Sequence, residues 1–121
     1  MLLIIHRKAY QDFLNLLYEL EKQSQSSALA TITADNQVIW LDLKQVFQKS
    51  IIPLTDEDLA PEVASRWRSL QSEIQREFRL LNTDWLFLIS SRQPATQEAR
   101  KKTFITRLSK LIKYCQEILT L

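Results

Sequence analysis

The sequence contains no glycine in its 121 residues, although an average usage of about 7% would give roughly eight. Glycine normally allows a backbone to turn tightly or to approach a ligand closely. Its absence excludes the glycine-rich loops that hold phosphates in nucleotide-binding proteins, and it removes the preferred residue of tight β-hairpin turns. The chain is therefore suited to helices that are joined by Asp, Asn, Ser, Thr and Pro and that act through their side chains.

Chemically reactive residues are also scarce. Cys115 is the single cysteine and His6 the single histidine, so a disulfide within the chain and a multi-cysteine zinc site are excluded. No local motif gives the histidine catalytic or metal-ligating partners. The acidic residues at 56–58 lack the spacing and the turn glycine of an EF-hand, and we interpret them as favourable charges before a helix N-terminus. We expect no catalytic residues, no metal and no cofactor.

Long apolar runs are missing too. The longest, Met1 to Ile5 and Trp85 to Ile89, fall far short of the roughly 20 residues that cross a bilayer, and the first lacks the flanks of a signal peptide. We therefore expect a cytoplasmic protein without membrane insertion, in keeping with its single cysteine. Residues 1–121 are long enough for one domain that buries roughly 60–70% of its unfolded surface.

Helical spacing of apolar residues is abundant. A first helix is predicted from Ile4 to Gln23. A second is predicted from Gln37 to about Ile52, with Asp35 or Asn36 as its cap. Residues 28–34 fit either a connector or an early helical turn.

The third helix is predicted most strongly. It begins at Pro61, which suits a first helical turn, and one stripe of residues recurs at steps of three and four. That stripe consists of Val63, Trp67, Leu70, Ile74, Phe78, Leu81, Trp85, Leu88 and Arg92. About 32 residues at a rise of 1.5 Å give a helix of roughly 48 Å. A second stripe of Leu80 and Phe87 should meet an additional neighbour, either another helix of the chain or a second subunit.

A fourth helix is predicted from about Thr96 to Leu119. The short link Ser91–Ala95 makes it antiparallel to the third helix, and the two shorter helices can bury their apolar faces against this hairpin. The predicted fold class is therefore all-α, a four-helix bundle in which the long third helix forms an antiparallel hairpin with the fourth. The excess length of the third helix indicates one protruding end. The sequence is compatible with a monomer and with a homodimer.

The net charge of +2 conceals an asymmetry. Residues 1–90 hold nine Lys or Arg and twelve Asp or Glu, whereas residues 91–121 hold seven and two. On the fourth helix, Arg100, Arg107 and Lys110 share one face. Such a face suits an acidic protein or phosphates, and an ordinary solvated surface is the simpler interpretation. Without interleaved aromatic residues or a nucleic-acid motif, a protein partner is favoured over nucleic acid.

Tryptophan supplies one further candidate. Trp67 and Trp85 lie on the main stripe of the third helix and are expected in the core. Trp40 stands between Ile39 and Leu41, where the apolar stripe of the second helix turns away, so partial exposure is expected. A partly exposed tryptophan is a common anchor of protein interfaces. Burial by the wide apolar face of the second helix is the alternative.

Three motifs carry a family resemblance: LLNTDWLFL at residues 80–88, RQPAT at 92–96 and LSKLIKYC at 108–115. Together they resemble the cyanobacterial heterocyst-frequency-control family, PatD, and the surroundings of Tyr10 and Phe47 are compatible with it. The resemblance implies a non-enzymatic regulator of cell differentiation that acts by contact with the division protein FtsZ. It brings no established binding residues with it.

The residues themselves supply candidates for partner binding. They are Arg92 and Gln93 in the link, Arg100, Arg107 and Lys110 on the fourth helix, and Trp40. The leading hypothesis is a helical adaptor that binds FtsZ or another acidic protein. The alternative is a nucleic-acid-binding accessory factor that uses the basic face of the last helix. An enzyme ranks third, because it would need a pocket in which His6 meets Cys115 or a carboxylate.

Overall fold

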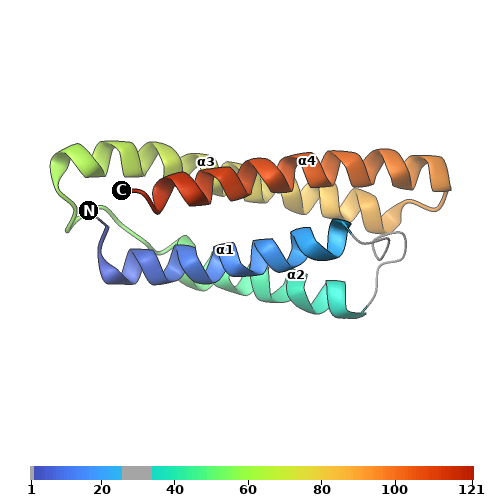
Figure 1. Ribbon diagram of the computed structural model, residues 1–121, viewed down its shortest axis with the longest axis horizontal. Coiled ribbons are helices and arrows are strands. Elements are labelled where there is room, and N and C mark those ends of the chain that lie inside the picture. The colour runs from blue at the N-terminus through green and yellow to red at the C-terminus, as the bar shows by residue number, and fades with distance from the viewer. Residues whose placement is uncertain (1, 26–33) are drawn as a thin grey trace.

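The computed structural model describes residues 2–25 and 34–121, which form four α-helices and one π-helical turn. The helices are α1 (Ile4–Gln25), α2 (Ala34–Val46), α3 (Pro61–Ser90) and α4 (Pro94–Ile118), and the π-helical turn η2 (Phe47–Ile51) continues α2. Successive helices run in opposite directions along one long axis (Figure 1). The all-α four-helix bundle is therefore as predicted.

The first two helices differ from the prediction at their facing ends. α1 extends to Gln25 because Ser24 is accommodated inside the helix, where its hydroxyl donates to the Leu20 carbonyl at 2.7 Å. α2 begins at Ala34, so the predicted cap at Asp35 or Asn36 is wrong. The Asn36 side chain instead donates to Gln23 of α1. The ambiguous segment 28–34 lies outside the described residues except for its last residue.

The corner between α3 and α4 is tighter than predicted. α3 ends at Ser90 and α4 begins at Pro94, so three residues form the link. The Ser91 hydroxyl donates to the Phe87 carbonyl at 2.7 Å, and the Gln97 amide donates to the Ser91 carbonyl at 2.8 Å. No described residue has a positive φ. Side-chain hydrogen bonds and proline thus turn the chain here without glycine.

The α3–α4 hairpin protrudes beyond the described ends of α1 and α2 (Figure 1). Its last buried side chains are Leu88 and Phe104, and none of residues 89–103 is buried. We define residues 86–103 as the hairpin tip. Within the tip, residues 89–103 stand outside the core and beyond the described ends of α1 and α2.

Aromatic side chains fill the space between α2 and α3. Trp40 stacks on Phe78 and Trp85, with ring centroids 5.4 and 5.0 Å apart, and Phe47 stacks on Phe78 at 4.3 Å. Among the described elements, α3 packs closely on α4, and α1 on α2 and α4, whereas the α2 and α3 backbones stand farther apart. Trp40 is only 4% exposed. Of the two interpretations of Trp40, burial is therefore confirmed and partial exposure is wrong, because this wider space needs a large side chain.

A chain of buried polar groups joins α1, α3 and η2. The Trp67 indole N–H donates to the Tyr10 hydroxyl at 2.8 Å, and that hydroxyl donates to Gln71 Oε1 at 2.6 Å. The Gln71 amide then donates to the Ile51 carbonyl at 2.8 Å, at the end of η2. Burial raises the pKa of Tyr10 well above its ordinary value, so the phenol stays protonated and can donate.

Replacing the central hydroxyl of this chain should destabilise the fold. Tyr10→Phe leaves the Trp67 indole and Gln71 Oε1 without their partner in the core, and we expect a loss of about 1–3 kcal/mol in the free energy of unfolding. Urea denaturation measures the difference. Tyr18→Phe is the matched control, because Tyr18 is 39% exposed and its hydroxyl accepts a hydrogen bond from Gln116 at the surface. Equal stabilities of the two variants would contradict the assignment.

Candidate partner-binding surface

A buried carboxylate lies at the contact between α3 and α4. The Glu77 side chain is 1% exposed, and its oxygens lie 3.0 Å from Arg107 Nη1 and 3.1 Å from Lys110 Nζ. Arg107 also donates through Nε to Asp84 at 2.6 Å. Two of the predicted basic residues, Arg107 and Lys110, are therefore already paired with acids of α3.

The charged side chains of Glu77, Asp84, Arg107 and Lys110 stabilise one another. Burial raises the pKa of Glu77, but hydrogen bonds from Lys110 and Arg107 and their positive charges outweigh it, so the net pKa lies below the ordinary value. Burial likewise lowers the pKa of Arg107, whereas its bonds to Asp84 and Glu77 raise it above the ordinary value overall. Both shifts favour the charged forms of Glu77 and Arg107, and Arg76 of α3 adds a further cation at 3.8 Å from Glu77.

The basic residues of the hairpin tip are in a different position. Arg92, Arg100, Lys101 and Lys102 make no ion pair with any residue that the structure describes, and the tip contains one acid, Glu98. Arg92 and Gln93 are both exposed in the corner. The predicted basic surface is thus reduced to its part nearest the corner.

The tip also exposes apolar side chains that the sequence prediction missed or placed elsewhere. Leu86, Phe87 and Ile89 are 52%, 47% and 45% exposed. The Arg100 guanidinium lies 4.7 Å from the centre of the Phe87 ring, an arrangement that places a cation over an aromatic face. The second stripe expected to meet an additional neighbour is therefore left uncovered at Phe87. The five consecutive apolar residues 85–89 were the available signal, because one face of a helix cannot bury them all.

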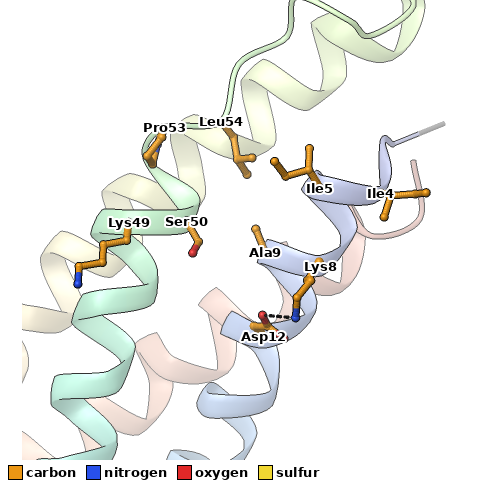
Figure 2. Close-up of a pocket in the computed structure, with 9 residues that line it drawn as sticks. All are labelled: Ile4, Ile5, Lys8, Ala9, Asp12, Lys49, Ser50, Pro53 and Leu54. Atoms are coloured by element: carbon orange, nitrogen blue, oxygen red, sulfur yellow. Dashed lines mark hydrogen bonds and ion pairs between the residues drawn. The ribbon is translucent and has the colours of Figure 1, made fainter.

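A hollow of about 530 Å³ lies at the opposite end of the bundle, between the start of α1 and the turn after η2 (Figure 2). Its lining is Ile4, Ile5, Lys8, Ala9, Asp12, Lys49, Ser50, Pro53 and Leu54. Figure 2 shows Lys8 turned toward Asp12, with which it pairs at 3.0 Å. The hollow offers apolar contact, and its Ser50 hydroxyl has no histidine among the lining residues to activate it.

His6 and Cys115, the single histidine and the single cysteine, are both buried among core side chains. His6 is 3% exposed, its Nε2 lies 2.8 Å from the Thr55 carbonyl, and its ring meets Trp67 edge-on at 5.5 Å. Cys115 is buried, and burial raises the pKa of its thiol far above the ordinary value. The part of the chain that the structure describes contains no cluster of His, Cys, Asp and Glu suited to a metal ion. None of the described helices is both long and apolar enough to cross a membrane.

Comparisons of the chain with protein-family models, curated proteins and solved structures found no match.

Neutralising the buried carboxylate should weaken the α3–α4 contact. Glu77→Gln keeps the shape of the side chain but removes the charge that balances Arg107 and Lys110. Since both cations reach water, with 26% and 52% of their side chains exposed, we expect a loss of about 1–3 kcal/mol rather than the larger loss of a fully buried pair. Chemical denaturation measures it. The control is Asp12→Asn, at the separate exposed pair with Lys8, which should change stability by less than about 0.5 kcal/mol.

The wild type and Glu77→Gln should also differ in how their free energy of unfolding depends on pH. Because the pKa of Glu77 is lowered in the folded state, its stabilisation is present above the unfolded value of about 4.3 and is lost as the pH falls through the folded value. The difference in unfolding free energy between the wild type and Glu77→Gln should therefore shrink from about pH 6 to about pH 3. A constant difference across that range would contradict the paired carboxylate.

Proposed function

We propose that this protein is a non-enzymatic regulatory adaptor that binds another protein through the hairpin tip. The observation that carries the proposal is the meeting of exposed apolar side chains with unpaired cations on one projecting element. Leu86, Phe87 and Ile89 supply the apolar part, and Arg92, Arg100, Lys101 and Lys102 supply the charge. Interface centres are enriched in aromatic residues and Arg, and their rims are polar.

The charge of the tip indicates the kind of partner. Four basic residues and one acid leave an excess of positive charge in residues 86–103, and the Arg100 guanidinium lies over the exposed Phe87 ring. A complementary partner surface is acidic, with an apolar centre that can accept the Phe87 ring. Opposite charge on the two surfaces steers their encounter and disfavours basic competitors.

The family resemblance supplies a specific partner to test. It points to FtsZ, and to the control of heterocyst frequency in a cyanobacterial cytoplasm as the process. An adaptor needs an exposed surface and no reacting groups, which agrees with the structural surroundings of His6 and Cys115. The nucleic-acid alternative has less support, because Arg107 and Lys110 are balanced by Glu77 and Asp84 and so contribute little free charge to a phosphate-binding stripe.

Co-sedimentation with FtsZ polymers tests the proposal. The double variant Arg92→Glu, Arg100→Glu should bind at least about tenfold more weakly than the wild type, because it reverses two of the unpaired charges. The matched control is Arg66→Glu, Lys113→Glu, which makes the same change in net charge at exposed positions outside the tip. The control should pellet with FtsZ like the wild type.

Equal pelleting of the wild type and the tip variant would show that the hairpin tip does not bind FtsZ. Absence of any wild-type pelleting would remove FtsZ as the partner. Retention on duplex or single-stranded DNA with a steep salt dependence would favour the nucleic-acid alternative instead.

A further inference from the structure

On one side of the bundle, two neighbouring helices are joined by side chains rather than by close backbone packing. The α2 and α3 backbones do not pack closely, unlike the other neighbouring pairs of described helices, and the stacked rings of Trp40, Phe47, Phe78 and Trp85 bridge the space between them. We define this side, between α2 with η2 and α3, as the seam. The four rings are each 4% exposed, so side chains close most of the space between the two backbones.

A hollow of about 240 Å³ opens in the middle of the seam. Its lining is Lys44, Phe47, Gln48, Ile52, Phe78, Arg79 and Asn82. The two phenylalanines are 4% exposed and form its deep part, while Lys44 comes from α2 and Arg79 from α3. Neither cation is ion-paired with a residue that the structure describes, and no carboxylate lines the hollow. The hollow therefore offers two unbalanced positive charges above an aromatic base.

Apolar side chains continue the seam from this hollow toward the hairpin tip. α2 and α3 run in opposite directions (Figure 1), and the stacked pair Trp40 and Trp85 faces across the seam. The next residue on each helix is rotated by about 100°, and for antiparallel helices this rotation carries Leu41 and Leu86 to the same side. They are 58% and 52% exposed, and Ile89 follows one turn later at 45%.

We propose that the seam is a docking groove for an amphipathic helix of a partner protein, one that carries carboxylates beside its apolar stripe. The apolar residues of such a helix, spaced by one turn, would cover Leu41, Leu86 and Ile89. Its carboxylate would enter the hollow between Lys44 and Arg79, where it would balance both charges. The partner's chemistry stated here rests on the proposed function, and the seam joins the hairpin tip directly through Leu86 and Ile89.

The charges on the seam decide among occupants. A basic or neutral helix would leave Lys44 and Arg79 without counter-charges while displacing the water that now solvates them, which is costly. A nucleic acid would find no exposed ring to stack on, since all four aromatic side chains that bridge the seam are 4% exposed. An acidic apolar helix is the occupant that meets both the charge and the apolar side chains.

Titration of the isotope-labelled full chain with designed peptides, followed by NMR, tests the inference. The probes are short helical peptides with leucines one turn apart and flanking glutamates, each paired with a twin in which lysine replaces glutamate. The glutamate peptides should shift the amide signals of Leu41, Lys44, Asn82 and Leu86 and bind at least about tenfold more tightly than their twins. Lys44→Glu, Arg79→Glu should reverse this preference. Arg66→Glu, Lys113→Glu should retain it.

Several results would overturn the inference. These are equal affinity for a peptide and its twin, shifts confined to residues 92–103, and self-association through the seam without peptide binding. Loss of the fold is checked by circular dichroism, and the two substituted side chains are at least partly exposed and outside the core.

The peptide titration also separates this inference from the proposed function. If the seam variant pellets normally with FtsZ while the tip variant does not, and the peptides fail to bind, the adaptor function stands and the seam inference fails. If the glutamate peptides bind the seam but the wild type does not pellet with FtsZ, the inference stands and the named partner fails.

Discussion

The buried carboxylate of Glu77 is the constraint on which the hairpin depends. A charge taken out of water is strongly unfavourable unless it is paired and hydrogen-bonded, so α4 must bring Arg107 and Lys110 to this level of α3. That requirement sets how far the two helices slide along each other. With the register fixed there, Leu88 and Phe104 become the last core residues, and everything beyond them projects as the tip.

The same pairing divides the basic residues of the C-terminal part into two groups. Arg107 and Lys110 pair with acids of α3, whereas those from Arg92 to Lys102 are at least partly exposed and form no ion pair with the residues that the structure describes. Position on the helix does not distinguish the groups, because Arg100 and Arg107 lie seven residues apart on one face. What distinguishes them is the neighbouring helix, which presents Glu77 and Asp84 to one group and Phe87 to the other.

Helical periodicity was sufficient for the elements and for most of the core. Pro61 as the start of α3 was predicted from its backbone preference, and Leu81 and Leu108 follow from their steps of three and four. The burial of Trp40 could not be predicted in this way, because it depends on the distance between α2 and α3, which no local pattern encodes. Glu77 and Asp84 lie seven residues apart, so they share one face of α3, and this spacing indicates a place for ion pairs. Which residues of α4 pair with them depends on the register of α3 against α4. The partner remains an expectation from the resemblance.

The three-residue corner at Ser91–Gln93 has a consequence for binding thermodynamics. Its backbone lies in ordinary negative-φ regions, and Ser91 is bonded to both helices, through its hydroxyl to the Phe87 carbonyl and through its carbonyl to the Gln97 amide, so the backbone of the corner has few conformations available to it. A surface ordered in advance loses little conformational entropy on association. Under the proposed function, binding at the tip would therefore need little rearrangement of the corner backbone.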